Sequence, residues 1–423
     1  MRVAGAGHAA AKATLTAGSD AVLGLVAANP GAWGNELVAS IAHDDDERFA
    51  LTIEFAHPGG AHDPETHSDL TIDEDDSRFV GTVLAGDSDL ARLDADGPWP
   101  LARPDERDVE SAACFSGGSD GDDVAAGVVA PDDESGGLYA LRASDGFNLL
   151  CLTPWDHRED VPRQVWEAAA ALCEQERAIL LVDAPKDHNA PEEATAFADE
   201  LGLGSARRNA ALYVPWLETR GPVGSRAPVA VPPAAAVAGI CARVDRHRGV
   251  WKAPAGQDAT VRAITGLAHA FSEEDIGELT QAGVNAIRTL RGSGTMVWGA
   301  RTLAGAQSEG TGEWRYLPIR RLALFVEDSL ERGLSWTAFE PNDEPLWQQI
   351  RQACEAFLQS LFEQGALMGD TSQEAFFVRC DETTTTPDDV AEGRVHLEVG
   401  LAATRPAEFV VVKLALGAGE PPA

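Results

Sequence analysis

One short motif in the sequence could support nucleophilic catalysis. Residues 117–121 read Gly-Gly-Ser-Asp-Gly and match the G-x-S-x-G pattern of α/β hydrolases, with Ser119 at the centre. Asp183 and His247 follow in the chain order of that class. The nucleophile of such an enzyme lies on a sharp turn from a buried strand into a helix, whereas Ser119 lies in a run of Asp, Gly and Ser. We therefore expect an acidic loop without a catalytic residue, and a hydrolase using Ser119 is kept as the alternative.

A second group of residues could bind a divalent metal ion. His57, His62 and His67 follow one another at intervals of five residues, with Asp63 and Glu65 between them. Imidazole and carboxylate groups are ligands of Zn²⁺ and related ions, but this spacing in a loop rich in Pro, Gly and Asp matches no ligand geometry. The Asp-rich runs also lack the spacing of an EF-hand calcium loop. We expect a solvated loop and no metal site.

Asp183 is the third candidate, because it ends a predicted parallel strand, where active sites of α/β proteins often lie. No Gly-rich phosphate loop follows a predicted strand, and no Walker lysine is present. We expect Asp183 to begin a turn or to cap the next helix, and we expect no cofactor.

The charge of the chain excludes several classes of partner. Its 423 residues include 68 Asp and Glu against 33 Lys and Arg, a net charge of -35. Nucleic acids and anionic membranes need clustered positive charge, so neither is an expected partner. Only four lysines occur, at positions 12, 186, 252 and 413. An acidic, lysine-poor surface is typical of a protein from a high-salt cytoplasm, where a Debye length of about 3 Å at 1 M salt screens the repulsion.

The remaining composition predicts a multi-domain globular protein without a membrane span. Hydrophobic residues make up 44% of the chain, and 423 residues exceed one ordinary core. The six cysteines form no CxxC pair, which favours free, mostly buried thiols in a reducing compartment. No charge-free apolar run is long enough to cross a bilayer, and the N-terminus does not match a signal peptide.

The elements that must position these residues fall into four regions. Residues 1–39 are expected to belong to the core, and residues 40–136 to form an acidic, β-rich insertion. Residues 40–135 contain 26 acidic and 5 basic residues. Within the insertion, residues 49–55 and 79–84 read as strands, and the lack of long apolar runs argues against a large independent core.

The third region, residues 137–248, alternates predicted strands with predicted helices. The strands are 147–152, 178–182 and 209–214, and the helices are 162–177, 191–201 and 234–246. This alternation predicts parallel βαβ units and a doubly wound α/β domain. The fourth region, residues 249–423, is predicted to be an α+β domain. Its expected helices are 271–281, 320–333 and 344–365, and its expected strands are 295–303, 376–380, 394–401 and 409–416.

Several segments resemble the sheath proteins of contractile tails, which occur in phages and in related injection systems. The first is Asn29 to Asn35, which reads NPGAWGN. The others, in chain order, are residues 249–256, 285–288, 297–302, 314–316, 320–322, 339–342, 347, 357–358, 365–367, 377–381, 393 and 405–410. Together, in this order, they make a specific match over residues 249–423. The first 18 residues do not resemble the extended arm that begins most members of this family.

The resemblance implies a structural role rather than an enzymatic one. Sheath subunits form hexameric rings stacked helically around an inner tube, and contraction drives the tube through a target envelope. The resemblance further implies that residues 249–423 face the tube, that the insertion faces outward, and that terminal arms add strands to neighbouring subunits. The residues expected at contacts with other subunits or the tube are Arg320, Arg321, Arg394, Arg405, Glu408, Phe409 and Lys413. On so acidic a chain, the first two could meet the acidic surface of a neighbour.

The implied partners are further copies of the chain, the inner tube protein, and baseplate and tail-terminator proteins. A second sheath paralogue is a further candidate. The subunit would assemble in the cytoplasm and become part of a virion tail or of a contractile particle. The alternatives are a halophilic α/β hydrolase and a generic shell or scaffold protein.

Overall fold

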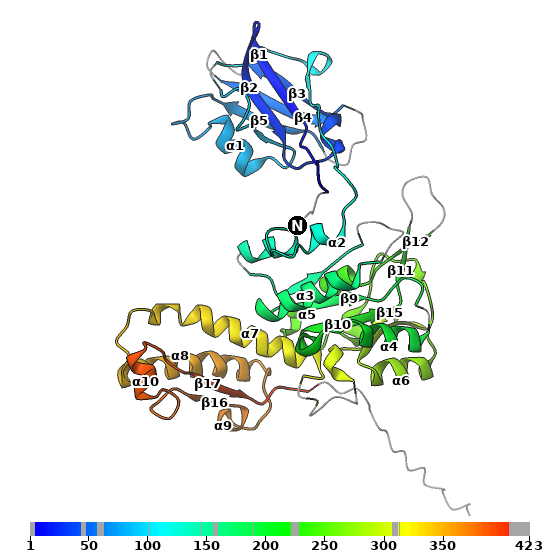
Figure 1. Cartoon of the computed structure of the whole chain (residues 1–423), viewed down its shortest axis with the longest axis vertical. Helices are drawn as coiled ribbons and strands as arrows, with labels where there is room; N and C mark the ends of the chain where they lie inside the picture. The colour runs from blue at the N-terminus through cyan, green and yellow to red at the C-terminus, as the bar shows by residue number, and fades with distance from the viewer. Residues whose placement is uncertain are drawn as a thin grey trace, which may run out of the picture. The chain divides into compact units, whose positions relative to one another are not determined.

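The structure is a computed structural model, in which the chain divides into two compact units (Figure 1). Unit 1 is Met1–Leu138 and unit 2 is Tyr139–Ala423. The described residues are 5–405, except for residues 44–47, 57–62, 101, 145, 155–159, 189, 221–227, 307–311 and 313. The expected strand 409–416 therefore lies outside the described residues.

Unit 1 consists of two antiparallel sheets and one main helix. The first sheet has the order β1-β2-β6, and the second has the order β5-β4-β3-β7. The strands are β1 (Lys12–Ala17), β2 (Asp20–Ala27), β3 (Leu37–His43), β4 (Phe49–Phe55), β5 (Glu65–Leu70), β6 (Ala91–Leu93) and β7 (Ala113–Cys114). The helices are α1 (Val80–Asp87) and the single turn α2 (Ala126–Val129).

Alternating residues of both sheets form one hydrophobic core in unit 1. Leu15 and Leu25 of the first sheet, Leu51 and Ile53 of the second, and Leu84 of α1 are all fully buried in it. This core is larger than the sequence led us to expect, because residues before position 40 supply a large share of it. The expected boundary at residue 39 falls inside β3, so residues 1–39 and 40–136 lie together in unit 1.

The segment 79–84, which we expected to be a strand, is instead the start of α1. Val80, Val83 and Leu84 are buried, and their spacing of three and four residues places them on one face of a helix. A short apolar run fits both a strand and a buried helix, and here packing against β5 and β6 selects the helix.

Unit 2 contains a five-stranded sheet with the order β15-β14-β10-β9-β8. Four strands are parallel: β8 (Leu149–Cys151), β9 (Ile179–Asp183), β10 (Ala210–Val214) and β14 (Val284–Leu290). The edge strand β15 (Gly294–Val297) is antiparallel to β14 and shorter than the expected strand 295–303. The helices around this sheet are α3 (Arg163–Gln175), α4 (Pro191–Glu200), α5 (Ala234–Arg248) and α6 (Glu273–Gln281). All four helices overlap the predicted ones.

Both faces of β9 are buried. Ile179 and Leu181 form a core with Val237 and Ile240 of α5. Leu180, which points the other way, is also fully buried, and α3 packs on the same strand. The sheet is therefore covered on both sides, which explains why its strands are continuous apolar runs.

The last part of unit 2 is a pair of long helices next to a two-stranded sheet. The helices are α7 (Leu317–Gly333) and α8 (Glu344–Glu363), and β16 (Phe376–Arg379) pairs antiparallel with β17 (Glu398–Leu401). α9 (Ser372–Ala375) and α10 (Pro387–Ala391) are single turns. A third sheet joins β12 (Pro228–Val231), β11 (Leu217–Arg220) and β13 (Gly266–Leu267). Short 3-10 helices are Ala32–Glu36, Val109–Ser111, Gly137–Ala143, Gly204–Asn209, Gly256–Ala259, Leu303–Gly305 and Ser335–Thr337.

The cysteines and the helices bear on two general predictions. All six cysteines are free; four are buried, whereas Cys114 is exposed. Among the described residues, no helix combines the length and the apolar character needed to cross a bilayer.

Candidate functional site: a groove beside an unpaired strand edge

β17 offers an unpaired edge. Phe377 faces Gly400 in its antiparallel pairing with β16, and Val378 faces Val399. Within the described part of the chain, β16 is the only strand that pairs with β17. A strand with one partner presents a row of backbone N–H and C=O groups along its other side. Such an edge accepts another extended segment, because the main-chain hydrogen bonds require no particular sequence.

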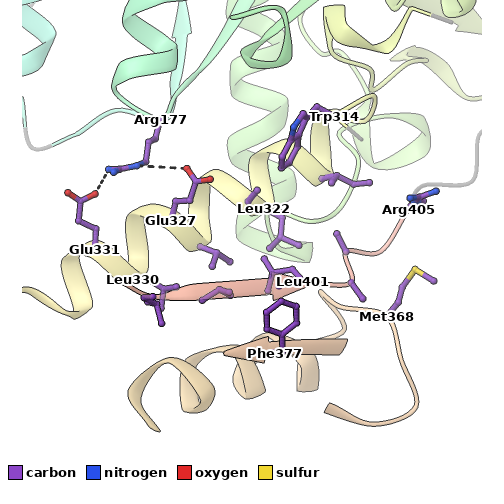
Figure 2. Close-up of a pocket in the computed structure, with 18 of the residues that line it drawn as sticks. Arg177, Trp314, Leu322, Glu327, Leu330, Glu331, Met368, Phe377, Leu401 and Arg405 are labelled. Carbon is purple, nitrogen blue, oxygen red and sulfur yellow. Dashed lines mark ion pairs between the residues drawn. The ribbon is translucent and has the colours of Figure 1, made fainter. Parts of the chain in front are cut away.

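A groove of about 1220 Å³ lies between this edge and α7 (Figure 2). We call it the β17 groove. Leu322, Val326 and Leu330 of α7 lie on one helical face at intervals of four residues and form one wall. Leu322 and Val326 are buried in the core of the unit, whereas Leu330 is half-buried. Val399 and Leu401 of β17 line the opposite side. Apolar walls on both sides of a strand edge favour an extended, apolar occupant.

Phe377 forms part of the floor of the β17 groove and is 44% exposed. Its ring lies over Gly400, where a Cβ atom would stand only 2.0 Å from the nearest ring carbon. Met368, which is 52% exposed, also lines the groove. Large apolar side chains left this accessible at one place indicate a surface that another segment covers.

Charged groups stand at the ends of the β17 groove. Arg177 forms ion pairs with Glu327 and Glu331 of α7, as Figure 2 shows. Arg405 lines the groove from the chain that follows β17. The described lining contains no Ser, Cys, His or Lys, so its chemistry is that of a binding surface rather than of a nucleophilic site.

The structure corrects the expectation for Arg320 and Arg321. Both are buried, at 5% and 4% exposure, and both are bound within the unit. The guanidinium group of Arg321 makes two hydrogen bonds to the carboxylate of Asp245 on α5, at 3.0 and 2.5 Å. Nε of Arg320 donates to Oδ1 of Asn209 at 3.0 Å, and its guanidinium lies 4.7 Å from the ring centre of Trp314. These arginines attach α7 to the 3-10 helix Gly204–Asn209 and to α5, and both are occupied within the unit.

The other expected contact residues have different environments. Arg394 is exposed and pairs with Asp389 and Glu392 beside α10. Arg405 is exposed and lines the β17 groove. Glu408, Phe409 and Lys413 lie outside the described residues. Of the predicted contact residues that the structure describes, only Arg405 therefore lines this groove.

Ser119 does not lie on a nucleophile elbow. It forms an isolated bridge with Ala9 in unit 1, and its Oγ accepts a hydrogen bond from the backbone N–H of Gly121. His57 and His62 lie outside the described residues, while His67 is on β5. The described residues contain no group of three or more His, Cys, Asp or Glu placed to hold a metal ion.

Asp183 caps a helix, but this is α5 and not the next helix in the chain, α4, as the sequence led us to expect. Its Oδ1 accepts a hydrogen bond of 2.7 Å from the backbone N–H of Ala234, the first residue of α5. The side chain is buried, and burial raises its pKa to about 8. Its other carboxyl oxygen is buried and has no hydrogen-bond partner among the described residues. Asp183 joins the end of β9 to a helix that begins 51 residues later.

Sequence reasoning missed the apolar wall of the β17 groove. The signal was present, because Leu322, Val326 and Leu330 repeat at helical spacing. That spacing alone does not distinguish a face covered by the same chain from one left open. Phe377 and Gly400 could be recognised as partners only once the register of β16 and β17 was known.

Two family models match this chain over most of its length. The phage tail sheath protein central domain matches residues 127–303, and the phage tail sheath C-terminal domain matches residues 309–416. Among curated proteins, the tail sheath protein of Vibrio phage KVP40 is 25% identical over 154 residues, which is 36% of this chain. The match spans only 22% of that relative's length.

Solved structures of contractile sheaths are also similar. The helical sheath of the anti-feeding prophage in its contracted state is 30% identical, with a TM-score of 0.57, over 72% of this chain and 78% of that one. The sheath complex of an extracellular contractile injection system, PVC, also in its contracted state, is 32% identical. Its TM-score is 0.56, over 66% of this chain and 73% of that one.

Proposed function

Because the chain belongs to the phage tail sheath family, we propose that it is the structural subunit of a contractile sheath, whose copies assemble around an inner tube and contract. The proposal does not require a catalytic residue or a cofactor, since the work of contraction comes from exchanging one set of subunit contacts for a more stable set. A halophilic hydrolase using Ser119 and a closed shell are not favoured by these similarities.

The observation that carries the proposal is the open edge of β17 next to an apolar wall. We propose that a terminal segment of a neighbouring subunit adds a strand there. The chain after Arg405 supplies a suitable segment, since residues 409–416 read Phe-Val-Val-Val-Lys-Leu-Ala-Leu and are rich in strand-forming residues. Main-chain pairing would provide affinity, and the accessible side chains of Leu330, Met368 and Phe377 would cover the side chains of the added strand.

Finer features of the assembly are part of the same proposal. We propose stacked hexameric rings, contacts with the inner tube through residues 249–423, and an outward position for the acidic region 40–136. Glu408, Phe409 and Lys413 are proposed contact residues, together with Arg394 and Arg405. Baseplate and tail-terminator proteins, and a second sheath paralogue, are the other proposed partners.

Three further expectations are retained. We describe the α/β core as doubly wound, which is supported by α5 and α3 packing against the two-sided strand β9. We propose assembly in the cytoplasm and incorporation into a phage tail or an extracellular contractile particle. We propose a high-salt environment, because a net charge of -35 repels itself in dilute buffer.

The test is assembly in molar salt, alone and with a candidate tube protein, observed by negative-stain electron microscopy. We expect striated tubes or sleeves from the unmodified chain. Phe377→Asp should abolish them, because it places a charge in an apolar groove, at a cost of several kcal/mol. Trp99→Asp is the matched control, since Trp99 is 42% exposed and lies in unit 1.

Each outcome has a distinct meaning. Tubes formed by Phe377→Asp as readily as by the unmodified chain would refute the role of the β17 groove. If the unmodified chain formed only small particles, both alone and with the tube protein, the sheath function itself would be refuted.

A further inference from the structure

The turn between α7 and α8 carries two exposed aromatic side chains. We call residues 335–343 the hairpin tip. Phe339 is 106% exposed and Trp336 is 43% exposed. Burying one such side chain is worth about 1.5–3 kcal/mol, so complete exposure forgoes a large gain in free energy. Neither residue lines the β17 groove.

The backbone holds Phe339 in this position. Its φ of 72° is in the left-handed region, which costs a residue with a Cβ atom about 1–2 kcal/mol. The turn is nevertheless ordered by hydrogen bonds, from Thr337 N to the carbonyl of Leu334 at 2.9 Å and from Glu340 N to the carbonyl of Thr337 at 3.1 Å. A strained residue on an ordered turn, with its ring fully in solvent, suggests a contact that the single chain does not make.

Unit 2 also contains a second large groove. Its charged lining residues are mostly basic, whereas the charged residues of the hairpin tip are acidic. We call this groove the Trp298 groove; its volume is about 910 Å³. Trp298 is 41% exposed and Ile276 adds to the apolar lining. Arg248, Lys252 and Arg405 also line it.

Positive charge of this kind is scarce on a chain with a net charge of -35 and four lysines. Arg248 and Lys252 share one acidic partner, Asp258, at 2.8 and 3.8 Å. Arg405 makes no ion pair with any described residue. Glu273, which lines the groove, is already paired with Arg288 at 2.9 Å. Among the described residues, the positive charge of the Trp298 groove is therefore not fully neutralised.

The hairpin tip and the Trp298 groove are complementary. The tip presents two aromatic rings together with the carboxylates of Glu340 and Asp343. The groove presents apolar walls, an accessible indole and cationic groups. An aromatic anchor that enters an apolar pocket, surrounded by opposite charges, is the usual composition of an interface hot spot.

A single chain cannot make this contact with itself. The tip ends where α8 begins at Glu344, whereas Gln364 and Gly365, just after the end of α8, line the groove. The 20 residues of α8 span about 30 Å at 1.5 Å per residue. The two surfaces therefore lie at opposite ends of one rigid helix (Figure 1).

We propose that the hairpin tip of one copy, with Phe339 as its anchor, docks in the Trp298 groove of a second copy. Each copy then donates one tip and accepts one, which is a head-to-tail contact that generates rings or helical stacks. The inference rests on the proposed self-assembly and adds a contact separate from strand addition at the β17 groove. Molar salt weakens the charged rim but leaves the aromatic anchor effective.

The test places a photo-crosslinking amino acid, p-benzoylphenylalanine, at position 339 of the full chain. Isotopically labelled and unlabelled copies are mixed, irradiated in molar salt and mapped by mass spectrometry. We expect links between copies, from position 339 to residues 248–256 or 298–301. The same probe at position 99 is the control and should not reach these peptides. Links from position 339 to other peptides, or no links, would overturn the proposal.

Two variants then separate this inference from the sheath function. Trp298→Ser should lower the yield of links from position 339 by about 10-fold, the effect of losing one aromatic contact worth about 1.4 kcal/mol. Phe339→Ser should weaken association by about 10- to 100-fold, whereas Trp99→Ser should not. Unchanged tubes from Phe339→Ser would refute the tip contact and leave the sheath function intact. Links to the groove without any tubes would support the contact and refute the sheath function.

Discussion

The ion pair between Arg321 and Asp245 should be the main electrostatic attachment of α7 to α5. The Arg321 side chain is 3% exposed and the Asp245 side chain is 28% exposed. Removal of one partner leaves a buried charge without compensation, at a cost of about 3–5 kcal/mol. Asp245→Ala should therefore destabilise unit 2 by that amount. At about 2–4 °C per kcal/mol for a region of this size, the melting temperature should fall by roughly 6–20 °C.

The assay combines thermal unfolding with hydrogen exchange of peptides from α5 and α7, in molar salt. Exchange gives the local free energy of opening, which is needed because a chain of two units need not unfold in one step. Glu167→Ala is the control. It breaks the exposed i,i+4 pair Arg163–Glu167, whose side chains are 59% and 43% exposed, and should cost about 0.3–0.5 kcal/mol.

Replacing both partners gives a second check. Arg321→Met combined with Asp245→Leu removes the charges together and should recover most of the lost stability, because a well-packed apolar pair can match a buried ion pair. Equal effects of Asp245→Ala and Glu167→Ala would refute the reasoning. A double variant as unstable as Asp245→Ala alone would show that packing, rather than the unpaired charge, causes the loss.

Two further predictions concern helix caps. Because burial raises the pKa of Asp183 to about 8, folding becomes less favourable as pH rises from about 4 to about 8, by about 1.36 kcal/mol per pH unit. The Asn side chain of Asp183→Asn cannot ionise, so between pH 5 and pH 7 this variant should keep about 2–3 kcal/mol of unfolding free energy that the unmodified chain loses. Equal slopes of the unfolding free energy against pH, measured with denaturant, would contradict this. Ser272→Ala removes the hydroxyl that accepts a hydrogen bond from the N–H of Asp275 at 3.2 Å. It should lower the stability of α6 by about 0.5–2 kcal/mol, measured as faster hydrogen exchange in that helix. Unchanged exchange would show that the cap is not needed.

Elements with strong local signals could be predicted from the sequence. Ser272 precedes three acidic residues, and the structure shows a reciprocal capping box that starts α6 there. The long amphipathic pattern of residues 344–365 predicted α8 to within two residues of its observed end. The alternation of apolar strands and helices likewise predicted β8, β9 and β10 together with α3, α4 and α5. For the helices, the interactions that decide the element lie within a few residues of one another.

The family was also evident from the sequence, because order and spacing of short motifs do not depend on folded geometry. The central and C-terminal sheath domains match residues 127–303 and 309–416, which include the segments that carried the resemblance from residue 249 onward. The candidate site was less evident. An unpaired strand edge depends on the partner that β17 has, which is a property of the whole sheet.

Contacts between residues far apart in the chain decided the features that the sequence did not predict. Arg320 and Arg321 read as surface residues, yet Asn209 and Asp245 lie 111 and 76 residues away in the chain and bury them. Sequence alone determined the family, the main helices and the excess of negative charge. Only the tertiary structure decided which charges are paired and which apolar faces stay open, because both depend on contacts between segments far apart in the chain.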